Sequence, residues 1–543
     1  MKKYFLIFFS FLLVSCGQKV DLLVYNANVY TANETFDQAT SFVVKNGVFL
    51  DIGFEGEDLN DKYNPDNVVD AHGLTIIPGL IDAHCHFLQY GLENQQLNLR
   101  GTKSFNEILN KVISYYKENK PKVIYGRYWD QNDWKVNEFP DKKKLDSVFP
   151  EIPVVLERID GHALLVNQKA LDIAGIDFNT NLPGGTIMRK DGHLTGILID
   201  SPKNLIIKSL PRPTNIDKVK ALIAAQNKCF EYGLTTVDDA GLSKNDILLI
   251  DSLQQSNIIN MRIYAMISNI KDDVNYFIKK GTYKTDKLNV RSVKVYADGA
   301  LGSRGAVLKE PYSDDINNKG KYITSFESID SLALKLSLTD FQMNTHAIGD
   351  AANRTVLEIY NKVLKNKSDP RWRIEHSQII SPEDFQLFNS KIIPSIQPTH
   401  ATSDMYWADE RLGHKRLKDG GYAYKKLLDW SGTVALGTDF PVEKINPFHT
   451  FYSAVARKDL LGYPVSGFQK ENSLSRYEAL MGMTSWAAHA NFEEKEKGSI
   501  EIGKFADFVI LDRDIMNVDE KDIPSTKVVA TILDGQIVYS NRF

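Results

Sequence analysis

The sequence predicts an α/β protein: a (β/α)8 TIM barrel with an inserted subdomain after its first strand, and a small β-sandwich domain built from both termini. Three observations lead to this prediction. Eight short apolar runs recur along the chain, a long stretch without such a run follows the first, and alternating apolar and polar residues mark both chain ends.

The eight runs have the composition of strands buried on both faces, which is typical of a parallel sheet covered by helices. Helical patterns separate them, such as DKVKALIAAQNKCFEYG before the second run. Eight alternating units fit a closed barrel. The runs cover residues 74–84, 233–241, 261–267, 291–299, 341–350, 371–378, 392–400 and 432–440.

The two chain ends are predicted to form one small β domain. VDLLVYNANVYT and SFVVKNGVFLDIG near the start, and GKFADFVILDRD and VVATILDGQIVYSN near the end, alternate as antiparallel strands do. Neither pair can bury a face alone, and the gap after the first barrel run is too long for a connection. We therefore expect a β domain from 16–75 plus 495–543, a barrel from 76–97 plus 216–494 and an insert from 98–215.

The first residues have the features of an export signal. Lys2 and Lys3 precede an apolar run from Phe5 to Val14 that is short for a membrane span. LVSC resembles the lipobox of bacterial lipoproteins, which implies removal of the signal peptide 1–15 and a lipid on Cys16. We expect export and anchoring to a bacterial membrane, on the periplasmic side or cell surface. The alternative is a buried N-terminal strand with a chance cysteine.

Composition describes an ordinary globular protein, with 43% hydrophobic and 25% charged residues. The formal charge is −4, and without a polybasic block there is no electrostatic case for nucleic acid. A small-molecule partner is favoured. Beyond Cys16 only Cys85 and Cys229 are left, so no disulfide framework holds the fold and a hydrophobic core must do so.

Several runs end in residues that can bind metals or transfer protons. Catalytic groups in this fold lie at the carboxyl ends of the strands, so residues far apart in sequence are expected to meet at one rim. Taken singly, each has a structural alternative, such as a packed histidine or an aspartate that caps a turn. The residues are His84, His86, Lys294, His346, His376 and Asp439.

Local spacing supports a metal site. His84 and His86 are two residues apart on a strand and share a face, so both can reach one ion, while Cys85 faces the other way as a small packing residue. Lys294 lies between two valines and points into the barrel if those valines face the helices. A buried ammonium must be paired, deprotonated or modified.

These residues lie in motifs that resemble those of the amidohydrolase superfamily, and within it amidohydrolase family 3, which includes N-substituted formamide deformylases. The resemblance covers almost all of the chain after Cys16. It rests on PGLIDAHCH, GRYWDQNDWK, LERIDGHALLVNQKAL, PGGTIMRKDGHLTGIL, VKVYADGALGSRGA, NTHAIGDAAN, RIEHSQ, GTDFPVEKINPF and GKFADFVILDRD.

The resemblance implies two divalent metal ions. His84 and His86 would hold the first, His346 and His376 the second, and a carboxylated Lys294 would bridge them. Asp439 would contact the first ion and take a proton from the metal-bound water that attacks an amide-type C–N bond. Superfamily members with one metal lack the bridging lysine, so one ion stays an alternative. Zinc suits these ligands.

Further residues are assigned to the pocket by the same resemblance. His162 and His400 would orient the substrate carbonyl or stabilise a developing oxyanion. Arg304 and Asp298 are candidates for substrate binding, although Asp298 could also cap a turn. Trp129, with neighbouring aromatic residues, would form an apolar lid that favours aryl or other apolar substrates, or would pack in a core.

The predicted function is therefore hydrolysis of an N-acyl, N-formyl or cyclic amide. Two alternatives stay open: deamination or other C–X hydrolysis at the same metal site, and a binding lipoprotein without turnover. The sequence does not fix the substrate or the oligomeric state, for which a dimer is one option.

Overall fold

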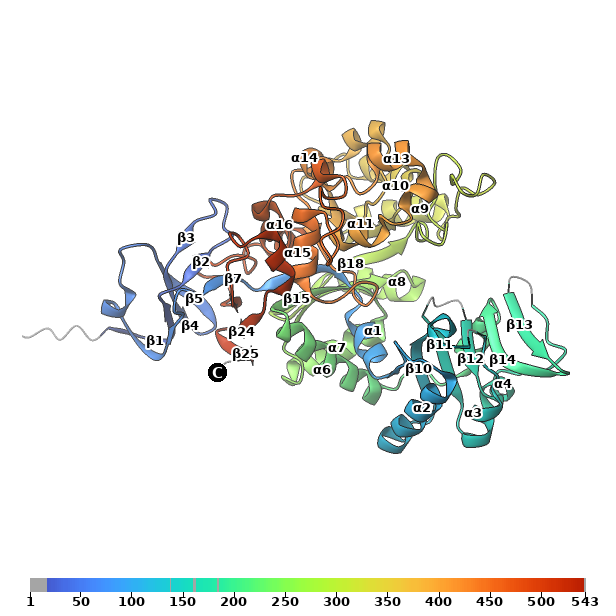
Figure 1. Cartoon of the computed structure of the whole chain (residues 1–543). Coiled ribbons are helices and arrows are strands. Elements are labelled where there is room, and N and C mark those ends of the chain that lie inside the picture. Colours follow the sequence, from blue (N-terminus) through green and yellow to red (C-terminus); the bar gives the residue numbers. More distant parts are fainter. Residues whose placement is uncertain (1–16, 137, 160–162, 183–184, 542–543) are drawn as a thin grey trace, which may run out of the picture. The chain divides into compact units, whose positions relative to one another are not determined.

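The computed structural model describes residues 17–136, 138–159, 163–182 and 185–541 (Figure 1). The chain divides into two compact units, Met1–Phe87 with Gln226–Phe543, and Leu88–Ala225. The first unit contains the barrel and the β domain. The second is the insert, and its bounds lie ten residues outside the predicted 98–215 at each end.

The first unit is built around a nearly closed barrel of eight parallel strands, which confirms the predicted TIM barrel. Each predicted run overlaps one of them, and neighbours along the chain are neighbours in the sheet. Strand β17 (Tyr283–Lys284) adds an antiparallel edge to β18. The barrel strands are β8 (Leu80–Cys85), β15 (Leu234–Leu242), β16 (Arg262–Ser268), β18 (Leu288–Tyr296), β19 (Gln342–Ala347), β20 (Trp372–His376), β21 (Ile392–Ile396) and β22 (Ala435–Leu436).

The barrel closes between its first and last strands by bonds just beyond the short β22. The Asp439 amide donates to the His84 carbonyl at 2.8 Å, and the His86 amide donates to the Phe440 carbonyl at 2.8 Å. The Asp82 carboxylate accepts from the Thr438 amide at 3.0 Å and from its hydroxyl at 2.7 Å. These bonds bring together two segments that are far apart in the sequence.

Gly437 is required for this close approach. A Cβ atom at this position would lie 2.5 Å from the His84 amide nitrogen and 2.9 Å from Asp82 Oδ1, which is closer than real contacts allow. The glycine therefore lets the last strand reach the first.

Helices follow the barrel strands, as the sequence pattern predicts (Figure 1). Some of their starts carry side-chain caps: Ser243 accepts from the Asp246 amide, and Ser475 with Glu478 forms a capping box. The helices within this unit are α7 (Lys244–Gln255), α8 (Lys271–Lys280), α9 (Phe326–Ser337), α10 (Asp350–Val363), α11 (Pro398–Asp404), α12 (Ala408–Leu412), α13 (His414–Gly420), α14 (Tyr424–Ser431), α15 (Pro447–Ala456), α16 (Arg476–Gly482) and α17 (Ser485–Ala490).

The β domain is a sandwich of two sheets. One sheet has the order β5-β4-β1-β6 and comes from the N-terminal segment; the other, β25-β24-β23-β7-β2-β3, combines strands from both chain ends, drawn in blue and red in Figure 1. The strands are β1 (Gln18–Tyr25), β2 (Asn28–Tyr30), β3 (Gln38–Ala39), β4 (Ser41–Lys45), β5 (Val48–Gly53), β6 (Tyr63–Asp70), β7 (Thr75–Pro78), β23 (Phe508–Leu511), β24 (Val528–Leu533) and β25 (Gln536–Ser540).

Side chains from both sheets fill one core, in which Phe42 packs edge-to-face on Phe508 with ring centroids 4.9 Å apart.

The first apolar run is divided between two domains. Strand β7 belongs to the sandwich, where it pairs with β2 and β23, and the barrel begins at Leu80. The change of domain therefore falls at Gly79, a few residues later than the predicted boundary at residue 76.

The insert has its own mixed sheet, in the order β13-β14-β12-β11-β10-β9. Helices α1 (Phe87–Asn94) and α6 (Asn215–Glu231) continue across its two boundaries with the first unit. Its elements are β9 (Leu97–Asn98), α2 (Phe105–Asn119), β10 (Ile124–Trp129), α3 (Lys143–Val148), β11 (Val154–Arg158), β12 (Ala163–Val166), α4 (Gln168–Ile173), β13 (Gly185–Lys190), β14 (His193–Asp200) and α5 (Lys203–Ser209).

Among the described residues no helix is long and apolar enough to cross a membrane. Cys16 and the signal peptide lie outside the described residues, so the lipid anchor and the export stay predictions.

Cys85 and Cys229 are buried free thiols, and burial raises the pKa of both well above the ordinary value. This fits the predicted packing role of Cys85.

Arg262 joins the start of β16 to the β domain. Its guanidinium is fully buried and donates to both carboxylate oxygens of Asp507, at 2.6 and 2.9 Å, and to Asp534. It also donates to the Asp286 carbonyl at 2.7 Å and lies 4.0 Å from the centroid of the Phe505 ring. Removing this cation would leave the buried Asp507 carboxylate without its charged partner.

We therefore predict that Arg262→Met lowers the free energy of unfolding by about 3–5 kcal/mol, measured by urea unfolding. The control is Lys415→Met, which breaks an exposed ion pair with Asp419 within α13 and should leave stability nearly unchanged. An equal loss of unfolding free energy in the two variants would show that the buried Arg262 ion pair contributes no more to stability than an exposed one.

Candidate metal centre

The six ligand candidates all lie at the carboxyl ends of barrel strands, where the fold brings them to one rim. His84 is near the end of β8 and His86 follows it; Lys294 lies on β18 and His346 on β19. His376 is the last residue of β20, and Asp439 follows β22.

Three of these candidates form one compact group. The ligand atoms of His84, His376 and Asp439 all lie within 4.8 Å of one another, and all three side chains are buried. This is a geometry that one ion can occupy with small adjustments.

The other three surround this group. His86 Nε2 is 3.3 Å from Asp439 Oδ1, and Lys294 Nζ is 3.1 Å from His84 Nε2. The His346 and His376 ring centroids are 4.4 Å apart. The structure therefore gathers all six candidates.

Several of their atoms have no hydrogen bond within the part of the chain that the structure describes. Buried His346 Nε2, His376 Nδ1 and Asp439 Oδ1 are without one, although His86 lies near Asp439 in poor hydrogen-bonding geometry. A buried polar atom without a partner is costly, and these atoms are the types that divalent transition metals bind. The residues present therefore fit a metal ion.

Three of the histidines, His84, His346 and His376, are held neutral. Burial is the main cause and the positive charge of Lys294 adds to it, so the pKa of His84 falls to about 4 and that of His346 to about 3. Burial and the neighbouring His346 lower the pKa of His376 well below its ordinary value. A neutral imidazole is the form that binds a metal.

Lys294 is fully enclosed, and burial lowers its pKa to about 8 although Glu375 and Asp439 oppose the shift. Its side chain points into the barrel between Val293 and Val295, which are buried, as the alternation of the strand predicts. A minor fraction of the amine is then neutral near pH 7, and this neutral form is the nucleophile.

Asp439 and His400 form a charged pair at the rim. His400 Nε2 is 3.2 Å from Asp439 Oδ2, and its Nδ1 is 3.5 Å from Glu443 Oε1. Burial opposes protonation of His400, but the two carboxylates outweigh it and raise its pKa well above the ordinary value. Burial likewise opposes ionisation of Asp439, but His400 and the other histidines hold its pKa well below the ordinary value. His400 thus contacts Asp439 directly.

The backbone is strained at two of these residues. His376 has φ of 74° and Asp439 has φ of 61°, both in the left-handed region that non-glycine residues rarely adopt. Such conformations cost about 1–3 kcal/mol each and concentrate at functional sites. Surrounding packing holds both side chains toward the rim.

Asp298 is held by backbone amides from two loops. Its buried carboxylate accepts from the amides of Val307, Ile348 and Gly349 at 2.8–3.0 Å, and Oδ1 is 3.7 Å from His346 Nε2. These bonds hold the loop after β18 against the loop after β19. The turn-holding alternative is therefore the one that its contacts support.

Two other predicted substrate residues are engaged elsewhere. Arg304 pairs through two nitrogens with Asp314, at 3.0 and 2.7 Å. Trp129 is fully buried in the insert's own core, where its indole donates to the Leu156 carbonyl at 2.9 Å. His162 lies outside the described residues.

Tyr296 was not singled out from the sequence, although it lies two residues after Lys294 on the same face of β18. The Lys294 Nζ is 5.0 Å from the centroid of its ring, and the His346 ring is 5.4 Å from it. With 38% of its surface exposed, it stands out from the buried strand. Within the described part of the chain its hydroxyl has no hydrogen-bond partner, so it is free to meet a ligand.

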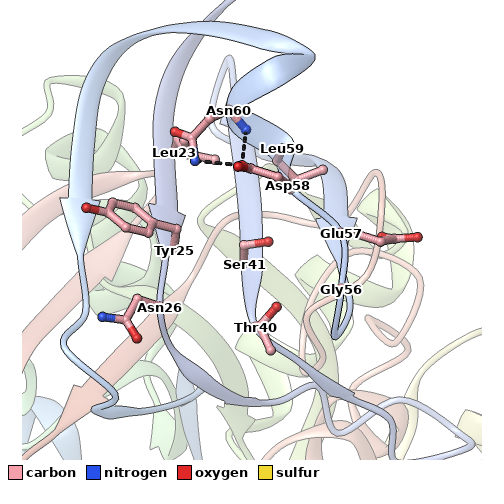
Figure 2. A pocket seen from close by; sticks show the side chains of 10 residues that line it. All are labelled: Leu23, Tyr25, Asn26, Thr40, Ser41, Gly56, Glu57, Asp58, Leu59 and Asn60. Carbon is pink, nitrogen blue, oxygen red and sulfur yellow. Dashed lines mark hydrogen bonds between the residues drawn. The ribbon is translucent and has the colours of Figure 1, made fainter.

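Two cavities found in the structure lie in the β domain, away from these ligands. One, of about 410 Å³, lies beside β1 and β4 and includes Ser41, Asp58 and Asn60 (Figure 2). The other, of about 430 Å³, opens between β6 and β25. Neither includes a metal-binding candidate.

A TIM barrel with histidines, a lysine and an aspartate gathered at its carboxyl rim defines the class of a metal-dependent hydrolase. The chain belongs to the amidohydrolase family, whose sequence model matches residues 67–539. It is accordingly a hydrolytic enzyme that acts on C–N bonds.

Two curated relatives cover nearly the whole chain. Protein LONG AFTER FAR-RED 3 of Arabidopsis thaliana is 32% identical over 96% of this chain and 92% of its own. An N-substituted formamide deformylase of Arthrobacter pascens is 26% identical over 96% of this chain and 99% of its own.

A solved structure described as an uncharacterized metal-dependent hydrolase of Pyrococcus furiosus has the same fold. It is 24% identical with a TM-score of 0.77, and the match covers 91% of this chain and 100% of the other. The match to the family model confirms the resemblance inferred from the motifs.

Proposed function

We propose that this enzyme hydrolyses an amide-type C–N bond in a small molecule, with N-formyl and N-acyl amines as the first substrates to test. The observation that carries the proposal is the buried His84, His376 and Asp439 group, whose ligand atoms lie within 4.8 Å of one another. The full-length similarity to an N-substituted formamide deformylase supports the choice of substrate class.

His84, His86, His346, His376 and Asp439 would hold one or two divalent ions, with zinc the ion that suits imidazole and carboxylate together. When bound, such an ion supplies a water of lowered pKa and polarises the substrate carbonyl. The buried ligand atoms that lack hydrogen bonds in the described structure support this assignment.

Asp439 would accept the proton and return it. Its Oδ1 has no hydrogen bond in the described structure, while Oδ2 is held by His400 at 3.2 Å. An ionised carboxylate held in this way can take a proton at Oδ1 and pass it to the leaving nitrogen. His400 would orient Asp439 and offset its negative charge. Glu443 holds the other ring nitrogen of His400.

Lys294 is proposed to carry a carboxyl group. Its neutral Nζ would form a bond to the carbon of carbon dioxide and release one proton, which leaves an anionic carbamate in place of an amine. Enclosure among ligands makes this exchange favourable, because an anionic oxygen binds a cation that an ammonium would repel. The alternative is a single ion with Lys294 unmodified.

Deamination at the same rim is the competing reaction. Products separate the two reactions, since amide cleavage gives an amine and an acid whereas deamination gives free ammonia. The preference for a substrate with an apolar or aryl group stays a prediction. Trp129 gives it no support as a lid residue, because it lies in the core of the insert.

We predict that Asp439→Asn lowers hydrolysis of N-formyl and N-acyl amines by about 10²–10⁴-fold, because the proton acceptor is lost. The measurement is amine release by zinc-loaded protein, with chelated wild-type protein as a second inactive sample that zinc restores. Wild-type protein that releases no amine across N-acyl, N-formyl and cyclic amides, or whose rate survives chelation, would contradict the proposal.

We predict that Lys294→Ala reduces bound metal from two ions to one or fewer per chain, counted by plasma mass spectrometry. The control is Lys497→Ala, which removes another buried lysine, paired with Glu493 at 2.8 Å away from the ligands. Two ions retained in Lys294→Ala would rule out the bridging role.

We also predict that Tyr296→Phe lowers kcat by about 10²-fold without changing metal content, since a donor to the substrate oxygen is lost. Tyr322→Phe serves as control, because that hydroxyl instead contacts Thr355. Unchanged kcat in Tyr296→Phe would show that the hydroxyl does not contact the reacting group.

A further inference from the structure

Behind His84 lies a buried row of alternating charges that the ligand set does not explain. Asp238, Arg373 and Glu375 are each fully buried in the barrel interior. Burying three charges is expensive, and apolar residues of similar size would fill the same space at lower cost. Their arrangement relative to His84 indicates what they do.

Glu375 contacts the side of His84 that faces away from the other ligands. Its Oε2 is 2.5 Å from His84 Nδ1, while His84 Nε2 is 3.1 Å from Lys294 Nζ and 3.7 Å from Asp439 Oδ1. A carboxylate can only accept, so the Nδ1 hydrogen points to Glu375 and the Nε2 lone pair points to the ligand cluster.

Arg373 holds Glu375 in turn. Its Nε is 2.9 Å from Glu375 Oε1 as an ion pair, and one terminal nitrogen donates to Oε2 at 3.4 Å. Because Arg373 and Glu375 are two residues apart on β20, both point to the barrel interior.

The guanidinium is fixed on its remaining sides. It donates to Asp238 at 2.7 Å, to Ser395 at 2.9 Å and to the Ala83 carbonyl. Asn491 donates to the other Asp238 oxygen at 2.7 Å. The bond to Ala83 also fixes the backbone directly before His84, so the row constrains both the main chain and the ring of that ligand.

We infer that Glu375 is a positioning residue, held by Arg373 and Asp238, that fixes His84 in the tautomer and orientation needed to bind a metal through Nε2. This inference rests on the proposed function, since it requires a metal at the rim. Partners of metal-binding histidines typically contribute about 10–100-fold to metal affinity.

The test is the zinc dissociation constant, measured by competition with a chromophoric chelator. Glu375→Gln keeps the side-chain shape and is expected to weaken zinc binding about 10–100-fold. The matched control is Asp384→Asn, which removes another buried carboxylate, paired with Lys309 and Arg354 at 2.6 Å, and should leave the constant unchanged.

Affinity within twofold of wild type in Glu375→Gln, or an equal loss in Asp384→Asn, overturns the inference while leaving the proposed function intact. Wild-type protein that binds no zinc overturns both together. Cobalt-loaded protein gives a second readout, since a reoriented His84 should change the visible absorption of the ion in Glu375→Gln but not in Asp384→Asn.

A measurement on unsubstituted protein covers the case in which Glu375→Gln fails to fold. In zinc-loaded wild-type protein labelled with ¹⁵N-histidine, His84 is expected to carry its hydrogen on Nδ1, with a proton shifted downfield by the short bond to Glu375. The signal is assigned by its loss in His84→Asn. A hydrogen on Nε2 of His84 would overturn the inference.

Discussion

The candidate site depends on closure of the barrel between β8 and the segment after β22. The sheet is not hydrogen-bonded continuously across this seam; the backbone bonds of Asp439 to His84 and of His86 to Phe440, with the Asp82 clamp on Thr438, join the two sides. Two predicted ligands at the end of the first strand, His84 and His86, and Asp439 from the last segment thereby come together. Because a Cβ atom at position 437 would clash with His84 and Asp82, this glycine matters to the geometry of the rim.

The interior of this barrel is more charged than stability alone would favour. Arg373, Glu375 and Lys294 are enclosed with Asp238 and Asp439, where each unpaired charge would cost several kcal/mol. Charges of opposite sign are therefore adjacent, since Arg373 lies between the carboxylates of Asp238 and Glu375. Glu375 in turn accepts a hydrogen bond from the neutral ring of His84. Strained backbone at His376 and Asp439 adds to the cost. A barrel selected only for stability would have apolar layers here.

Different features of the sequence allowed prediction to different depths. The eight apolar runs predicted the barrel, and the residue types at their ends predicted the gathered ligands. Asp298 was ambiguous between two roles because its partners, the amides at 307, 348 and 349, come from two separate loops. Arg373 and Glu375 stand in the RIEHSQ motif beside His376, yet their partners lie on β8, β15 and β21 and could not be read from that motif.

The sequence by itself determined the order and type of the elements and which residues stand at strand ends, because apolar periodicity and alternation are local properties of the chain. The two-residue spacing also determined that His84 shares a strand face with His86, and that Lys294 shares one with Tyr296. Only the tertiary structure decided which groups touch. Glu375 meets His84 across the barrel interior, and Arg304 pairs with Asp314, because side-chain packing and the cost of leaving buried charges unpaired select partners that sequence spacing does not specify.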